Sequence, residues 1–181
     1  MQNHKLSIPY HSQCIEVPDS FWNIRSCGGA CIKMILDYQK VEAPSVLEVM
    51  KLAESEGGYD MKNGFVHDWA VVFFQKNNLH SYRKETINEE EKEGLLAEMF
   101  ISIRKENPVM VSVEKRVLEQ TKYHLILVVG YEYETLDDMH HIKNVIYHDP
   151  ESTDKDRGAY RVCDVATFMN YWRGKAIFVS R

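Results

Sequence analysis

The spacing of hydrophobic and polar positions changes along the chain, from a helical period in the first part to strand-like runs in the second. Apolar residues at helical spacing predict four helices, over about 27–39, 45–56, 65–76 and 88–105. Ser45 with Glu48, and Asn88 with Glu91, have the spacing of capping pairs, in which side chains satisfy free N–H groups at a helix start. These pairs therefore mark the starts of the second and fourth helices.

The strand-like runs begin after Pro108. Segments rich in β-branched and aromatic residues predict strands over 109–113, 123–132, 142–148 and 176–180, with one helix at about 165–172. A first short strand is predicted over 5–10, and loops over 11–26, 116–122, 135–141 and 151–158. Helices gathered early and strands gathered late predict an α+β domain, with N-terminal helices packed on a C-terminal antiparallel β-sheet. We expect one domain over residues 1–181.

Composition narrows the class of protein. A chain of 181 residues can bury a substantial core, and its net charge of −5 with scattered basic residues argues against a nucleic-acid partner. It contains no apolar run of the roughly 20 residues that span a bilayer, and its N-terminus lacks a signal-peptide core. We therefore expect a cytoplasmic protein whose four cysteines are reduced. Oligomeric state is left open.

The candidate chemistry begins at Cys27, which is followed by two glycines and opens the first long predicted helix. A cysteine in the first turn of a helix has its thiolate favoured by the helix dipole and by free backbone N–H groups. The glycines are expected to leave open space around the sulfur. Cys31 lies one turn deeper and is expected in the core, whereas Cys14 and Cys163 have no comparable setting.

Three polar residues elsewhere in the chain suit a nucleophilic cysteine. His124 begins an apolar run typical of a central strand, and it is the histidine of the eight that is best placed for acid–base chemistry. Asp149 ends the next strand, where its carboxylate could accept a hydrogen bond from His124 and fix the ring tautomer. Gln13 could donate its amide to an oxyanion beside Cys27. The acidic loop after Asp149 lacks the pattern of a calcium loop.

These residues resemble the cysteine peptidases related to bacteriocin-processing enzymes, family thirty-nine of the papain-like clan. The similarity covers nearly the whole chain: residues 8–13 resemble the opening strand and oxyanion glutamine, residues 27–30 the nucleophile helix, residues 107–113 the Pro-Val strand, residues 124–131 the histidine strand and residues 148–150 the aspartate turn. The resemblance implies a papain-like fold, in which Cys27 attacks a carbonyl. His124 would be general base and acid, Asp149 its orienting partner and Gln13 the oxyanion donor, with a peptide or protein substrate and no metal or organic cofactor.

Two features depart from the family pattern. Gly29 stands where members usually have proline, and the chain has no transporter membrane segments. The favoured interpretation is a cysteine peptidase or amidase. Two alternatives stay open: an acyltransferase of transglutaminase-like type, and a catalytically silent peptide-binding domain of the same fold.

Overall fold

The computed structural model describes residues 1–62, 64–117, 120–136 and 139–181. Its helices are α1 Gln13–Glu16, α2 Cys27–Tyr38, α3 Val46–Ser55, α4 His67–Lys76, α5 Glu89–Arg104, α6 Lys155–Gly158 and α7 Val165–Tyr171. Its strands are β1 Gln2–Lys5, β2 Tyr59–Asp60, β3 Gly64–Phe65, β4 His80–Glu85, β5 Val109–Val117, β6 Gln120–Leu136, β7 Met139–His148, β8 Arg161–Asp164 and β9 Trp172–Ser180. None of the helices in these ranges is long and apolar enough to cross a bilayer.

One antiparallel sheet organises the molecule, with strand order β4-β9-β5-β6-β7-β8. The long strand β6 is its centre: β5 pairs with its first half, and β1 continues along the same edge, opposite residues 130–133. Gly130 allows this close approach, because a Cβ there would lie 2.5 Å from the carbonyl oxygen of His4. β7 covers the other edge of β6. The antiparallel α+β class predicted from the sequence is confirmed.

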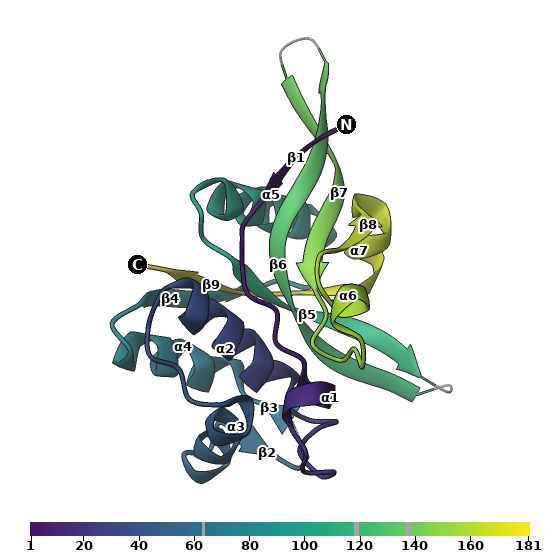
Figure 1. The fold of residues 1–181 in the computed structure, drawn as a ribbon. Helices are drawn as coiled ribbons and strands as arrows, with labels where there is room; N and C mark the ends of the chain where they lie inside the picture. Colours follow the sequence, from purple (N-terminus) through teal and green to yellow (C-terminus); the bar gives the residue numbers. More distant parts are fainter. Residues whose placement is uncertain (63, 118–119, 137–138) are drawn as a thin grey trace.

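Figure 1 shows α1–α4 gathered at one end of the sheet, with α5 and α7 beside its other part. α2 packs against both α3 and β6, and its residues 28–32 and 34–36 are all buried. α5 packs against β1, β5, β6 and β9, whereas α7 packs against β5, β7 and β8. The buried apolar residues of these helices and of the sheet form one continuous core, to which α2 contributes through its contact with β6.

Several sequence-based boundaries need correction. The first strand is Gln2–Lys5 rather than 5–10, because after Leu6 donates to the carbonyl of Val129 the chain leaves the sheet. The third helix begins at His67, since the residues before it form the β2–β3 hairpin. The segment 11–26 contains α1, and 151–158 contains α6. The predicted loops 116–122 and 135–141 are largely strand; residues 118–119 and 137–138 lie outside the described ranges.

Of the two predicted capping pairs, one forms fully. Ser45 and Glu48 make a reciprocal capping box. Asn88 caps α5 by accepting from the backbone of Glu90, whereas the Glu91 carboxylate accepts from the Thr86 hydroxyl at 2.6 Å. The pairing of Asn88 with Glu91 was therefore wrong, although the helix start was right.

The glycines after Cys27 do not leave the open space expected from the sequence. A Cβ on Gly28 would lie 2.6 Å from atoms of the Phe65 ring, and one on Gly29 would lie 2.9 Å from Met50 and 3.0 Å from the carbonyl oxygen of Val46. Both glycines are buried. They let α2 pack closely against β3 and α3.

We expect Gly28→Ala to lower the free energy of unfolding by about 1–3 kcal/mol, because the added methyl group overpacks the contact with Phe65. The matched control is Gly94→Ala in α5, where a Cβ meets open space. That change should raise stability by about 0.5–1 kcal/mol through helix propensity. Urea unfolding followed by circular dichroism measures both values. Equal effects of the two substitutions would contradict the packing argument.

Candidate active site

Cys27 is the first residue of α2 and stays partly exposed, whereas the helix behind it is buried. The preceding residue, Ser26, uses its hydroxyl to bind the carbonyl of Trp22 at 2.8 Å instead of capping the helix. The first N–H groups of α2 therefore have no side-chain cap from Ser26. A helix start of this kind favours a negative charge beside it.

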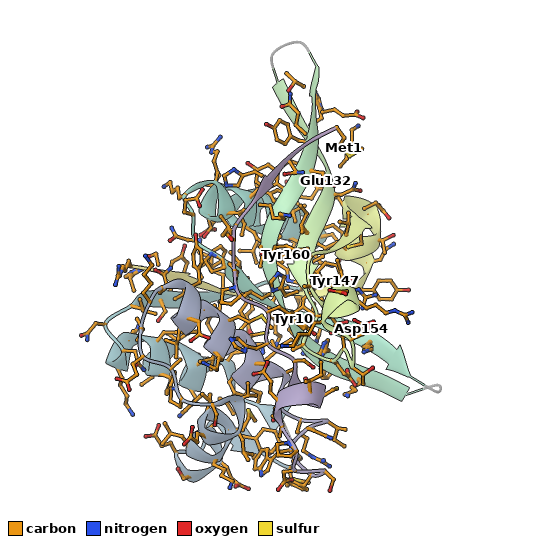
Figure 2. The ribbon with its side chains drawn as sticks, in the orientation of Figure 1. Met1, Tyr10, Glu132, Tyr147, Asp154 and Tyr160 are labelled. Atoms are coloured by element: carbon orange, nitrogen blue, oxygen red, sulfur yellow. The ribbon has the colours of Figure 1, made fainter. Side chains whose placement is uncertain are left out.

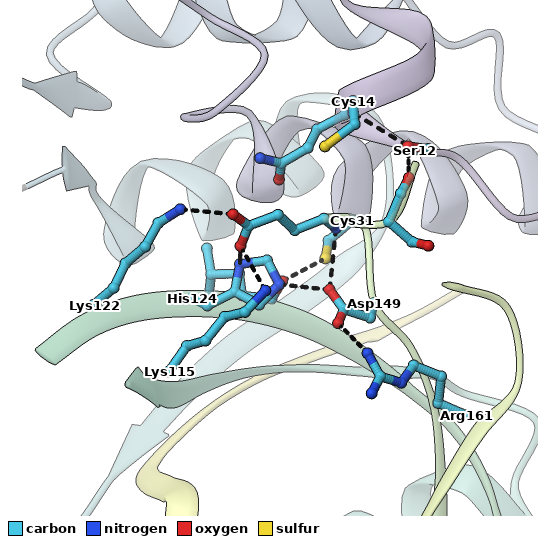
Figure 3. A network of polar contacts seen from close by, with 12 residues as sticks. Ser12, Cys14, Cys31, Lys115, Lys122, His124, Asp149 and Arg161 are labelled. Atoms are coloured by element: carbon cyan, nitrogen blue, oxygen red, sulfur yellow. Dashed lines mark hydrogen bonds and ion pairs between the residues drawn. The ribbon is translucent and has the colours of Figure 1, made fainter. Parts of the chain in front are cut away.

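His124 and Asp149 form a buried pair, as Figure 3 shows. His124 lies on β6, and its Nε2 is 2.8 Å from Oδ1 of Asp149 in the turn after β7. The same Asp149 carboxylate accepts from the Glu151 backbone N–H at 3.0 Å and from Arg161 Nη1 at 2.7 Å. His124 comes from β6, Arg161 from β8 and Glu151 from the segment after β7, so the Asp149 carboxylate links these three parts of the chain.

Electrostatics link Cys27 to this pair. Burial disfavours the Cys27 thiolate, but a side-chain hydrogen bond with His124, the His124 charge and a backbone hydrogen bond from Leu125 outweigh it, so the thiol pKa lies below its ordinary value. Burial likewise disfavours the imidazolium, yet bonds to Asp149 and Cys27 raise the pKa of His124 to about 9. Burial also opposes the Asp149 charge, but His124 holds its pKa well below the usual range. All three shifts therefore favour the charged forms: a thiolate, an imidazolium and a carboxylate.

The other three cysteines behave differently. Cys31 is fully buried and its thiol faces the carbonyl of Leu125 at 3.7 Å, which confirms the expected core position. Burial and the nearby Cys27 raise its pKa well above the ordinary value. Burial also raises the pKa of Cys14, and that of Cys163 to about 11. Among the four, the thiol pKa is lowered at Cys27 alone.

Gln13 is buried in α1, next to the turn that carries Asp149. Its backbone N–H donates to the carbonyl of Pro150 at 3.0 Å, and its side-chain amide donates to the carbonyl of Asn23 at 2.7 Å. Its Oε1 is buried without a partner in the described part of the chain. Within the described ranges this amide makes no hydrogen bond to Cys27 or His124, so the oxyanion role of Gln13 stays a prediction.

Two other histidines lie in charged or buried surroundings. For His11, Nδ1 is 2.9 Å from Glu16 and Nε2 is 2.7 Å from Asp37. For His67, burial and the charges of Lys175 and Arg173 lower the pKa to about 4. Neither lies in the network around His124.

A cavity of about 360 Å³ opens beside His124 and Asp149. Its apolar wall is made by Val113, Ile126, Tyr147, Phe168 and Tyr171, and its charged rim includes Glu114, Lys115 and Arg161. The sequence does not reveal this cavity, because α7 and β8, which are distant from His124 along the chain, complete it. It does not point to Arg161 either, since β8 is not among the strands that the sequence predicts.

Comparisons with known proteins agree with the fold and identify the family. Residues 5–176 match the model of the Peptidase_C39 like family. The peptidase domain of Streptococcus ComA, described as a bi-functional ABC transporter involved in a quorum sensing pathway, has a similar structure: TM-score 0.59, 16% identity, 98% of each chain covered. The peptidase domain of Streptococcus mutans ComA in complex with a small-molecule inhibitor is also similar, with a TM-score of 0.51 and 17% sequence identity. That match covers 92% of this chain and 98% of the other.

A third similar structure is UfSP from C. elegans, with TM-score 0.59 and 11% identity over 99% of this chain and 34% of that one. No curated protein matches the sequence significantly. The fold is thus that of a papain-like cysteine peptidase domain. The chain belongs to the Peptidase_C39 like family, which confirms the resemblance read from the sequence and supports a cysteine peptidase function.

We expect Cys27 to react with iodoacetamide at a pH well below the ordinary thiol pKa, because the thiolate is the nucleophile and its pKa is lowered. His124→Ala removes the imidazolium, so the midpoint of the reaction should move upward in pH. The matched control is His80→Ala, at an exposed histidine of β4 that should leave the midpoint unchanged. Mass spectrometry of each cysteine across pH gives the profiles. The same Cys27 midpoint in wild type and in His124→Ala would contradict the electrostatic coupling of Cys27 to His124.

Proposed function

We propose that this protein is a cysteine peptidase or amidase in which Cys27, His124 and Asp149 form the catalytic triad and Gln13 donates to the oxyanion. The observation that carries the proposal is the link between the Cys27 thiol and the buried His124–Asp149 pair. A lowered thiol pKa beside a raised histidine pKa favours a thiolate–imidazolium pair, and the thiolate is the nucleophile in this chemistry. Membership of the Peptidase_C39 like family supports a peptide or protein as substrate.

The proposed reaction has two halves. The Cys27 thiolate attacks the substrate carbonyl carbon, and the carbonyl electrons move to oxygen. When the oxyanion collapses, the C–N bond breaks and the His124 imidazolium gives its proton to the leaving amine, which leaves an acyl thioester on Cys27. Water then attacks the thioester while neutral His124 takes its proton. The acid leaves, and the thiolate and imidazolium are restored.

In the proposal, Asp149 supports both halves by holding Nε2 of His124, so that Nδ1 is the nitrogen that serves Cys27. Its own charge is kept by Arg161 and the Glu151 N–H, so it stays a carboxylate throughout. In the proposal, the oxyanion accepts from the backbone N–H of Cys27 and from the side-chain amide of Gln13. In the proposal, the cavity beside His124 and Asp149 receives a substrate side chain against its apolar wall.

The direct test is digestion of a defined peptide library, with new termini read by mass spectrometry. We expect cleavage by the wild type and none by Cys27→Ala or His124→Ala, with losses of at least about 10³-fold. Acyl transfer to an added amine, without hydrolysis, would favour the transglutaminase-like alternative. A folded protein whose Cys27 resists both iodoacetamide and the peptidase inhibitor E-64 at neutral pH would favour the silent peptide-binding domain.

The oxyanion role of Gln13 has its own test. We expect Gln13→Ala to lower turnover by about 10²-fold or more, while the Cys27 alkylation profile and the fold stay as in wild type. Gln75→Ala is the matched control, because Gln75 also donates its amide to a backbone carbonyl, that of Ser81 at 3.0 Å. Unchanged turnover in Gln13→Ala would show that Gln13 is structural.

A further inference from the structure

A second carboxylate, Glu151, stands beside His124. It follows Asp149 by two residues, and its side chain is 20% exposed. Its Oε1 lies 2.9 Å from Nζ of Lys122, and its Oε2 lies 3.0 Å from Nζ of Lys115. The same Oε2 is 3.8 Å from Nδ1 of His124. Figure 3 shows the two lysines, from β5 and β6, close to His124.

The two ring nitrogens of His124 therefore face two different carboxylates. Nε2 is hydrogen-bonded to Asp149 at 2.8 Å, whereas Nδ1 is 3.8 Å from Glu151, beyond hydrogen-bonding reach. Glu151 thus acts on the imidazolium through charge, and it leaves Nδ1 free to serve Cys27. At this separation, beside a buried ring, an opposite charge favours the protonated form of His124.

We propose that Glu151 is a positioning residue of this site: held by Lys115 and Lys122, its carboxylate sets the charge around Cys27 and His124 and so the pH range of their ion pair. The proposal rests on the proposed function, in that it takes Cys27 and His124 as the reacting pair.

The charges around the pair fix the direction of the effect. Two lysines and one glutamate give this cluster one net positive charge. Removing the carboxylate adds positive potential, which favours the thiolate and disfavours the imidazolium, so both groups should lose their protons at lower pH. Removing one lysine should do the opposite. The titratable and charged groups that face the pair from the surrounding elements include Cys14, Cys31, Tyr59, Lys115, Lys122, Asp149, Glu151 and, through Asp149, Arg161.

Two further observations agree with this cluster acting as a unit. Burial opposes ionisation of Glu151, but Lys122, Lys115 and His124 together lower its pKa, so it stays charged at neutral pH. The charge of Lys122 in turn favours the Cys27 thiolate. The cluster therefore reaches both members of the pair.

The test is a set of charge variants in the full chain, with two readouts that need no substrate: the midpoint of Cys27 alkylation by iodoacetamide, and the NMR titration of the His124 imidazole. Glu151→Gln should lower both midpoints by about 0.5–1 pH unit. Lys122→Met should raise both by a similar amount. The double variant Glu151→Gln with Lys122→Met restores the net charge and should return both midpoints toward wild type.

Glu93→Gln is the control, because it removes one negative charge from an exposed position on α5. It should move neither midpoint. A purely structural role of Glu151 predicts that both single variants disturb the pair in the same sense, or not at all; either result would overturn the proposal. If Glu151→Gln does not fold, Lys122→Met still tests the opposite sign.

The two proposals can fail separately. A wild-type Cys27 that titrates as a free thiol and ignores His124→Ala overturns the proposed function, and the role of Glu151 with it. If the Cys27 midpoint shifts in His124→Ala but both midpoints stay in place in the charge variants, only the role of Glu151 is overturned.

Discussion

Burial of the Asp149 carboxylate is the constraint that the structure around the site must satisfy. A charge removed from water costs several kcal/mol unless hydrogen bonds and opposite charges replace the solvent. Asp149 receives three such partners: the ring of His124, the guanidinium of Arg161 and the N–H of Glu151. They come from β6, β8 and the turn after β7. The carboxylate is therefore satisfied only when these segments pair in the observed register.

The same register fixes the helix that carries the thiol. Leu125 follows His124 on β6, and its peptide groups meet α2 twice: its carbonyl accepts from Cys31, and its backbone hydrogen-bonds to Cys27. α2 is held from the other side by α3 and Phe65, which pack directly on Gly29 and Gly28. The relation of Cys27 to His124 is thus set by contacts of α2 with the Leu125 main chain and by close packing at Gly28 and Gly29.

The parts of this arrangement that depend on local signals could be predicted from the sequence. The start of α2 at Cys27, the apolar strand after His124 and the turn at Asp149 are each visible in a few neighbouring residues. The strands β4 and β8 were missed because they lie at the edges of the sheet and carry weak local signals: β4 is mostly polar, and β8 has only four residues. The filled space at Gly28 was missed for the same reason, since Phe65 reaches it from β3.

The charged neighbours of the triad were the hardest to predict, and their arrangement explains why. Arg161 reaches Asp149 because β8 pairs with β7, which places Arg161 opposite Tyr147. Lys115 and Lys122 meet because β5 and β6 place them opposite each other. The charged groups alternate in sign along these contacts. The Arg161 guanidinium meets the Asp149 carboxylate, which meets the His124 imidazolium. The imidazolium faces the Glu151 carboxylate, which binds the two lysines. Such alternation offsets the free-energy cost of burying these charged groups, because each one has a neighbour of opposite charge. It also makes the protonation of the site depend on the sign of each charge around it. These neighbours are brought together by strand pairing, so short stretches of sequence do not reveal them.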